Sequence, residues 1–293
     1  MTLSALLLNH AWLFVLGAAV LGLMVGSFLN VVIARLPVML TRQWQDQCRE
    51  LTDRPAETAP AETAFNLVTP RSHCPHCGHM IGALENIPLL SFLWLRGKCS
   101  ACKQPIAWRY PGVELLSGIL SGLVAWHFGL GPAALAALLL TWALIALSFI
   151  DIDRQLLPDV ISLPFLWLGL IVNLFGGFTG LPAAVIGAVA GYVSLWSVFQ
   201  LFKLITGKEG MGYGDFKLFA LFGAWLGWQM LPLIILLASL VGAILGLAFI
   251  VLKGRDRRLP IPFGPFLCAA GWLVMLWGDE MLGFYLKFAR LAA

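Results

Sequence analysis

Two aspartates beside apolar segments are the residues of this chain best suited to chemistry. Asp151 directly follows the apolar run ALIALSFI, and Asp215 ends the segment GMGYGD and precedes another apolar run. Carboxylates beside apolar segments of this kind are rare and usually functional. If helix packing brings the two together, the pair holds one proton over a wide pH range, because adjacent carboxylates do not both ionise easily. One carboxylate then activates a water molecule and the other protonates a leaving amine, which is peptide-bond hydrolysis without a covalent intermediate.

The segment before Asp215 carries glycines at alternate positions, 210, 212 and 214. Glycine adopts backbone conformations closed to other residues and lets a second chain approach closely. Irregular backbone at membrane depth is stable where it is buried in protein or lines a watery cavity. Gly212 and Gly214 are therefore candidates for a loop that receives an extended substrate, although a flexible connector with a capping Asp215 explains the same pattern.

The other acidic residues near apolar segments have simpler interpretations. Asp153 is adjacent to Arg154, which favours a solvated ion pair. Asp159 precedes an apolar run and suits the N-cap or first turn of a helix. Glu114, near the start of another apolar run, is placed to interact favourably with the amino-terminal end of a helix dipole. Nucleophilic hydrolysis is less well supported, because the chain has no GxSxG segment and its histidines lie in unpromising contexts.

Four of the six cysteines form two CxxC knuckles, which are separated by 21 residues: Cys74, Cys77, Cys99 and Cys102. This spacing is typical of a tetrahedral zinc site with four thiolate ligands. The three neighbouring histidines, His73, His76 and His79, are expected to face solvent or to support the ligands. Cys48 and Cys268 have no partner by spacing, and we expect both to be inert.

The elements that position these residues are membrane helices. The chain has 293 residues, is 60% hydrophobic and only 12% charged, and has a mean hydropathy of +0.87. Globular domains have about 25% charged residues, so this composition indicates a membrane protein. The segment from Ala11 to Leu36 is too long for a signal-peptide core and is interpreted as a retained span.

Apolar stretches recur along the chain, and the sixth is long enough to cross a bilayer twice, with a turn predicted at Trp228–Pro232. The sequence therefore predicts an all-α polytopic membrane protein with about eight transmembrane helices. With the amino terminus outside, the inner loops and their flanks hold 17 of the 19 Lys and Arg residues. The positive-inside rule then places both aspartates and the cysteines on the cytoplasmic side. The stretches are Ala11–Ile33, Gly112–Leu130, Pro132–Ile150, Val160–Phe178, Leu181–Leu204, Phe216–Leu252 and Pro262–Trp277.

We predict three parts along the chain. Residues 1–34 form the first transmembrane helix, residues 35–110 a small cytoplasmic zinc-binding domain, and residues 111–293 a transmembrane catalytic domain. The segment PAETAPAET (Pro55–Thr63) is interpreted as a solvated linker within the second part. A domain of this size usually needs a staple, which zinc would supply. Because the cytoplasm is reducing, structural disulfides between the knuckles are disfavoured.

The chain resembles the type IV prepilin peptidase and N-methyltransferase family along nearly its whole length. The segments that carry the resemblance are GSFLNVVIARLP from Gly26, the two knuckles with ENIPLLSF between them, IDIDRQLLPD from Ile150, TGKEGMGYGDFKL from Thr206 and PIPFGP from Pro260. By this resemblance, the catalytic aspartates of a GxGD-type aspartyl protease fall on Asp151 and Asp215, and the tetracysteine set falls on the two knuckles.

The resemblance further implies cleavage of the leader from prepilins and pseudopilins, in type IV pilus assembly or type II secretion, at the cytoplasmic face of a bacterial inner membrane. It also implies methylation of the new amino terminus from S-adenosylmethionine. No Rossmann-type GxGxxG fingerprint accompanies this, so the methyl-donor site stays open. The family links Gly97 to methyl transfer, whereas the residues themselves favour a turn before the second knuckle. The expected partners are the precursors and the lipid bilayer, with no nucleic acid.

Three other interpretations compete with peptidase activity. An ion- or proton-coupled transporter uses intramembrane carboxylates, but it favours charges near the bilayer midplane, whereas these acids cluster at one interface. A presenilin-like protease shares GxGD but differs in its companion motifs. A zinc-binding membrane adaptor would leave the aspartate pair without a role.

Overall fold

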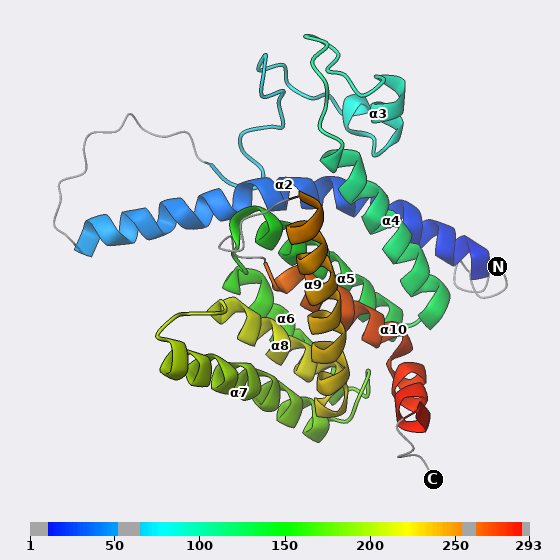
Figure 1. The fold of residues 1–293 in the computed structure, drawn as a ribbon. Helices are drawn as coiled ribbons and strands as arrows, with labels where there is room; N and C mark the ends of the chain where they lie inside the picture. The colour runs from blue at the N-terminus through cyan, green and yellow to red at the C-terminus, as the bar shows by residue number, and fades with distance from the viewer. Residues whose placement is uncertain (1–10, 52–64, 254–261, 289–293) are drawn as a thin grey trace. The chain divides into compact units, whose positions relative to one another are not determined.

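The computed structural model describes residues 11–51, 65–253 and 262–288, and these are almost entirely helical (Figure 1). They contain no β-strand, only two isolated bridges between residues of the knuckle region. The predicted all-α class is confirmed. The predicted linker Pro55–Thr63 lies outside the described residues. The chain divides into two compact units, Met1–Leu130 and Gly131–Ala293, and each is described by itself.

The first unit contains two long helices with the cysteine-rich segment between them. Its elements are α2 (Ala11–Leu51), η1 (Leu84–Asn86), α3 (Leu90–Trp94) and α4 (Arg109–Phe128). Small residues line the contact of α2 with α4: a Cβ added at Gly26 would lie 2.7 Å from the Cα of Glu114. Such small-residue contacts are typical of helices that pack in membranes. The glycines of α2 thus have a structural role, because they let the backbones of α2 and α4 approach each other.

Helix α2 is longer than the apolar stretch that predicts it. It continues from the expected end of the span at Ile33 through a polar segment to Leu51. Residues such as Arg, Gln and Glu have good helix propensity, so the helix does not end where hydrophobicity ends. Arg49 and Asp46 form an exposed ion pair one turn apart on this extension. The predicted boundary between residues 34 and 35 therefore falls inside a continuous helix.

The second unit is built around one short, buried helix, α8 (Tyr213–Leu226). All of its residues from Asp215 to Leu226 are buried except Lys217, as expected for a helix that is apolar on every side. Helices α6 and α7 pack against it, and α10 also contacts it (Figure 1). The other elements are α5 (Pro132–Arg154), α6 (Asp159–Leu174), α7 (Leu181–Thr206), η2 (Trp228–Met230), α9 (Leu231–Lys253) and α10 (Gly264–Phe288).

Glycines bring the backbones of α7 and α8 into direct contact. A Cβ added at Gly191 would lie 2.7 Å from the carbonyl oxygen of Phe219, and Gly187 faces the backbone of Gly223 with no room for a side chain. Gly187 and Gly191 are four residues apart and so lie on one face of α7, in the small-xxx-small pattern of membrane helix pairs. This contact fixes α8 against its longest neighbour.

Helices are present at all the predicted crossings, and the turn predicted at Trp228–Pro232 is confirmed. There α8 ends at Gly227, whose φ of 83° is closed to most other residues, and η2 leads into α9. Five helices in the described residues are long and apolar enough to span a membrane: Ala11–Leu51, Pro132–Arg154, Leu181–Thr206, Trp228–Ala248 and Gly264–Phe284. Eight crossings therefore remain a prediction.

A single buried amide joins the end of α6 to the end of α8. The Asn173 side-chain nitrogen donates to the carbonyl oxygens of Ala224 and Trp225, at 2.8 and 2.9 Å. Its oxygen accepts hydrogen bonds from the backbone N–H groups of Phe178 and Thr179, at 2.8 and 3.0 Å. The last carbonyls of a helix lack partners within the helix, so Asn173 satisfies groups that burial would otherwise leave unpaired.

Replacing this amide should loosen the second unit. We expect Asn173→Ala to lower the stability of the protein by about 3 kcal/mol, because several buried backbone groups lose their partners. The midpoint of thermal unfolding in detergent measures the effect. Thr206→Ala, at the exposed end of α7, is the control and should change stability by less than about 0.5 kcal/mol. Equal midpoints for the two variants would contradict this account of Asn173.

Candidate functional site

Asp151 lies in the last turn of α5 and is buried, with 6% of its surface exposed. Its Oδ2 atom accepts a hydrogen bond from the backbone N–H of Gly264, the first residue of α10, at 3.1 Å. A Cβ at position 264 would lie 2.6 Å from the same oxygen, so only glycine lets this N–H reach the carboxylate. The end of α5 is thereby tied to the start of α10 at the Asp151 carboxylate.

Asp215 lies in the first turn of α8 and is also buried, with 7% of its surface exposed. Its Oδ1 atom is buried and has no hydrogen-bond partner among the described residues. Buried carboxylate oxygens normally have partners, so an unpaired one indicates a group reserved for a ligand, a water or a proton. The backbone places it there, because Gly212 is the extended N-cap of α8 and its carbonyl accepts from the Asp215 N–H at 3.2 Å.

The structure brings Asp151 and Asp215 together. Leu157, in the link between α5 and α6, lies against both flanking glycines: its Cβ is 2.7 Å from a Cβ added at Gly214, and its Cδ2 is 3.2 Å from one added at Gly264. The two carboxyl groups are close enough to interact electrostatically. This arrangement suits acid–base chemistry, since one carboxyl can hold a proton while the other is ionised.

The remaining acidic candidates do not join this pair. Asp159 lies in the first turn of α6, as predicted, and forms an ion pair with Lys217 at 2.7 Å. Asp153 is exposed near the end of α5. Lys217 is the one residue between Asp215 and Leu226 on α8 that is not fully buried, and Asp159 compensates its charge.

The two glycines proposed for the substrate loop differ in their surroundings. Gly214 has no space for a side chain, because Leu157 fills it. Gly212 is exposed, and a Cβ there would meet only the Asp215 Oδ2, at 3.6 Å, within ordinary contact distance. A side chain at position 212 would therefore project beside the carboxylate without disturbing the packing. The rings of Phe199, Tyr213 and Phe216, with centroids 5.3 to 5.7 Å apart, hold the loop against α7.

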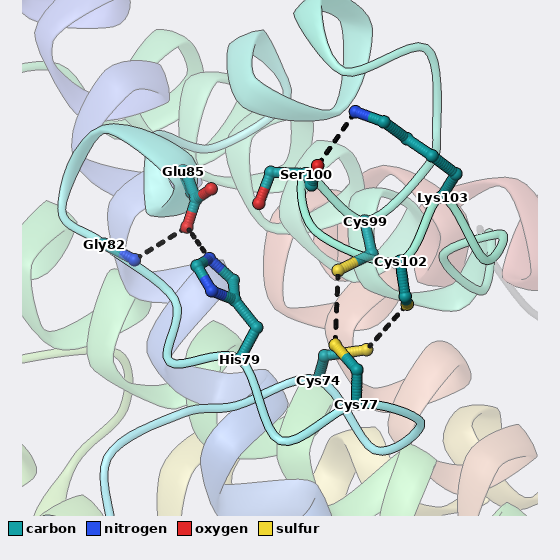
Figure 2. Close-up of polar contacts among 9 residues, drawn as sticks. All are labelled: Cys74, Cys77, His79, Gly82, Glu85, Cys99, Ser100, Cys102 and Lys103. Atoms are coloured by element: carbon teal, nitrogen blue, oxygen red, sulfur yellow. Dashed lines mark hydrogen bonds and ion pairs between the residues drawn. The ribbon is translucent and has the colours of Figure 1, made fainter.

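The four predicted cysteines gather into one cluster, whose sulfur atoms all lie within 4.8 Å of one another (Figure 2). The Sγ atoms of Cys74 and Cys102 are 3.8 Å apart, and those of Cys77 and Cys99 are 4.0 Å apart. Tetrahedral zinc with Zn–S bonds of about 2.3 Å separates its sulfurs by about 3.8 Å. The number, kind and spacing of the four thiols therefore fit a four-thiolate zinc ion.

The two knuckles share the same pattern of backbone hydrogen bonds. In the first, the Cys74 N–H donates to the His79 carbonyl and the Gly78 N–H donates to the Cys74 carbonyl, both at 2.9 Å. In the second, the Cys99 N–H donates to Gln104 at 2.9 Å and the Lys103 N–H donates to Cys99 at 3.1 Å. Gly78 and Lys103, four residues after their first cysteines, both have positive φ, 71° and 60°.

The charges of the cluster also favour a cation. The backbone N–H of His76 stabilises the Cys74 thiolate and lowers its pKa to about 7. At Cys77 the backbone N–H of His79 acts in the same direction, but burial and the three neighbouring thiols outweigh it and raise the pKa to about 11. Four adjacent thiols do not all ionise without a positive charge among them, and a divalent metal supplies it.

Glu85 links the two knuckles from outside the cluster (Figure 2). Its Oε2 accepts from the Gly82 N–H at 2.9 Å and lies 3.2 Å from the Nε2 of His79. The Ser100 hydroxyl, the Gly82 N–H and His79 together hold the pKa of Glu85 at about 2, far below its usual range. All three neighbouring histidines are exposed, and the ring of His79 pairs with Glu85.

Gly97 forms the turn that the residues predict. Its φ is 67°, its N–H donates to the Phe92 carbonyl at 2.8 Å, and its carbonyl accepts from the Ile106 N–H at 2.7 Å. A Cβ at this position would lie 3.0 Å from the Phe92 ring. Both the backbone conformation and the packing therefore favour glycine here.

Two residues at the aspartate pair were missed by sequence reasoning. Gly264 lies in the segment PIPFGP, which carries the resemblance but had no assigned role. Its glycine between Phe263 and Pro265 was the available signal, because such a position often marks close backbone approach. Leu157 gave no signal, since a leucine in LLPD looks like any apolar residue.

The chain matches two family descriptions that together cover most of its length. Residues 20–128 match the bacterial peptidase A24 N-terminal domain, and residues 138–247 match the type IV leader peptidase family. No solved structure matches the chain.

Curated relatives extend the match over the whole chain. A protein of Stutzerimonas stutzeri is 61% identical over 99% of this chain and 100% of its own length. One of Pseudomonas aeruginosa is 59% identical over 99% of both chains, and one of Legionella pneumophila is 48% identical over 98% of this chain and 99% of its own. Each of the three is named prepilin leader peptidase/N-methyltransferase. With this identity over its full length, and with the aspartate pair and cysteine cluster in place, the chain belongs to the type IV leader peptidase family.

Proposed function

We propose that this protein cleaves the leader peptide from type IV prepilins and pseudopilins and then methylates the new amino terminus. The observation that carries the first activity is the buried pair of Asp151 and Asp215, in which one Asp215 oxygen has no partner among the described residues. The second activity rests on the relatives' name and on their identity to this chain from end to end. S-adenosylmethionine is the proposed methyl donor.

The aspartate pair supplies the groups that leader cleavage requires. One carboxylate takes a proton from a water molecule, which attacks the scissile carbonyl, and the other carboxyl protonates the leaving amine. Gly264 holds Asp151 in place through its N–H, while Asp215 keeps a free oxygen for water or proton transfer. Because the burial of both groups favours one shared proton, acid and base are present together.

The distribution of charge supports a site on the cytoplasmic side of a bacterial inner membrane. In the predicted topology, the inner loops and their flanks hold 17 of the 19 Lys and Arg residues, and the same topology assigns both aspartates and the cysteines to that side. A precursor with a polar leader and an apolar helix would leave its leader in the cytoplasm and its helix in the bilayer. Helix α8 has 14 residues, a length of about 21 Å at 1.5 Å per residue. Either Asp215 would therefore sit slightly below the headgroups, or the bilayer would be thinner there.

The two aspartates should behave as one unit. We expect Asp151→Asn or Asp215→Asn to lower cleavage of a prepilin-like peptide by about 10²- to 10⁴-fold, because each removes an acid or a base. The double variant should be little worse than either single variant, since the residues act together. Cleavage by purified protein in detergent is the measurement.

Asp279→Asn is the matched control, because Asp279 is an exposed carboxylate on α10 of the same unit. It should cut at the normal rate. Normal turnover by either Asp151→Asn or Asp215→Asn would contradict the proposed roles.

We propose a structural zinc ion at the four cysteines, and metal analysis tests it. Purified protein should contain about one zinc per chain, and replacing Cys74 and Cys99 by Ser should remove it. Cys48→Ser is the control, because Cys48 is exposed on α2 and outside the cluster. The aspartates belong to the other unit, so we expect cleavage to survive zinc loss better than methylation does.

Stoichiometric disulfides in protein prepared without oxygen would overturn the zinc assignment. Full zinc content in the Cys74 and Cys99 variant would overturn it equally.

The loop before α8 should receive the backbone of the cleavage site, and Gly212 is the position that tests this. We expect Gly212→Val to lower kcat/KM for a prepilin-like peptide by about 10- to 100-fold, because the added side chain stands beside Asp215 where the substrate must approach. Gly214→Val should instead destabilise the protein, because Leu157 occupies that space.

Gly283→Val on α10, a position with open space around it, is the control for the extra side chain. A Gly212→Val variant that folds normally and cuts at the wild-type rate would show that the loop is only a connector.

A further inference from the structure

The first unit contains a carboxylate that leader cleavage does not use. Glu114 lies in the second turn of α4 and is half-buried. Its Oε2 atom accepts a hydrogen bond from the backbone N–H of Leu89 at 2.9 Å. Within the described part of the chain, Glu114 forms no ion pair, so its charge has no cationic partner there. A half-buried carboxylate without a cation is a candidate binding site for one.

Polar side chains from two other elements lie beside Glu114. Ser27 of α2 is next to its carboxylate, and the Ser27 hydroxyl also donates to the Asn86 Oδ1 of η1 at 3.4 Å. One turn further along α4, Ser117 is fully buried and its hydroxyl has no hydrogen-bond partner among the described residues. Ser27 and Asn86 belong to GSFLN and ENIP, two segments to which leader cleavage assigns no role.

The backbone at this place is strained. Leu89 has a φ of 59° and a ψ of −45°, outside the regions that leucine normally adopts. Its N–H is the group that donates to Glu114. Strain of this kind persists where the surrounding structure fixes it, and it concentrates at functional sites.

A cavity of about 230 Å³ adjoins the same cluster. Asn86 forms part of its wall, together with Arg71, Ser72, Gly82 and others, and most of the exposed wall is polar. Pockets that enclose a whole drug-sized ligand start at about 300 Å³, so this cavity accommodates one end of such a molecule. Arg71 presents a guanidinium, which suits a carboxylate at that end.

We propose that Glu114 binds the ammonium group of the newly cut amino terminus and takes its proton, and that the cavity at Arg71 holds the amino-acid end of the methyl donor. This inference rests on the methyltransferase half of the proposed function. An ammonium has no lone pair, so it must lose a proton before its nitrogen attacks a methyl carbon. The amino-acid end of S-adenosylmethionine carries the carboxylate that Arg71 would pair with.

Methyl transfer to the new amino terminus begins with the loss of a proton. Glu114 accepts one proton from the ammonium, and the freed lone pair forms a bond from nitrogen to the methyl carbon. The bond from that carbon to the sulfonium sulfur breaks, and its electrons remain on sulfur as a neutral thioether. The product amine is a secondary ammonium, and Glu114 passes its proton to water.

The groups that face Glu114 are polar and uncharged, so they do not compete with it for the proton of the ammonium. Ser27 from α2, the N–H of Leu89 and, through Ser27, Asn86 from η1 face Glu114. None of these groups is charged at neutral pH. On α4 itself, Tyr110 lies one turn before Glu114, and its backbone carbonyl accepts from the Asn30 side chain of α2 at 3.0 Å.

The pH profile of methylation tests the role of Glu114. At pH 6.5 the amine is mostly protonated, and we expect Glu114→Gln to methylate about 10²-fold more slowly than the wild type. An α-amino group has a pKa of about 8, so at pH 9 it loses its proton unaided and the deficit should shrink to about 10-fold or less. Glu114→Asp should recover part of the rate at pH 6.5. Leader cleavage, measured in the same preparations, should be unchanged.

Binding without the methyl donor gives a second readout. Wild-type protein should bind a cut pilin peptide with a free amino terminus more tightly than its N-acetylated form, and Glu114→Gln should lose that preference. Glu50→Gln, an exposed carboxylate on α2, should keep it. In equilibrium dialysis with S-adenosylmethionine, Arg71→Gln should weaken binding about 10-fold or more, as expected for loss of a charged hydrogen bond, and Glu114→Gln should not.

Each of the following outcomes would contradict one part of this proposal. A deficit of Glu114→Gln that is equal at every pH, or a matching loss of cleavage, would show that Glu114 only supports the backbone of Leu89. Unchanged dialysis with Arg71→Gln would remove the donor from the cavity. If wild-type protein does not methylate at all, that half of the proposed function fails, and the peptide preference still decides whether Glu114 binds an ammonium.

Discussion

The second unit depends on the burial of α8, of which every residue from Asp215 to Leu226 except Lys217 is buried. Helix α8 is apolar on nearly every side, and Gly187 and Gly191 of α7 let its backbone approach without intervening side chains. Asn173 closes its far end by satisfying the carbonyls of Ala224 and Trp225. With both ends and one face fixed, the first turn of α8 has little freedom. Packing therefore holds Asp215 at a defined place, although one oxygen of its carboxylate has no partner in the part of the chain that the structure describes.

The two units divide the chemistry between them. The second unit contains both aspartates, which lie on α5 and α8, and α10 contacts Asp151 through the N–H of Gly264. The first unit contains the four cysteines, and a metal there would organise two loops in which only Cys74 and Cys99 are buried. Glu85 strengthens this arrangement because it contacts the segment after one knuckle and a hydroxyl of the other. Each unit thus stabilises its polar groups with its own helices or loops.

Sequence alone predicts the features of this chain that arise from local patterns. The spacing of the cysteines predicts their cluster, the apolar runs predict the helices, and Trp228 to Pro232 predicts the turn after α8. It does not predict contacts between distant residues without side-chain signals: Gly264 reaches Asp151 across 113 positions through a backbone N–H. It also ends α2 too early, because hydrophobicity marks where a bilayer would end and helix propensity marks where a helix ends.

The contact between Gly264 and Asp151 limits which substitutions position 264 can tolerate. The donor is a backbone N–H, which every residue except proline provides, so no substitution can improve it. The space beside it excludes even one extra carbon, so almost every substitution removes it. Gly264 contributes no side-chain group to the site. A substitution at position 264 should nevertheless give the same phenotype as a substitution of Asp151 itself. A screen for inactive variants would therefore return this glycine together with the acid that it holds.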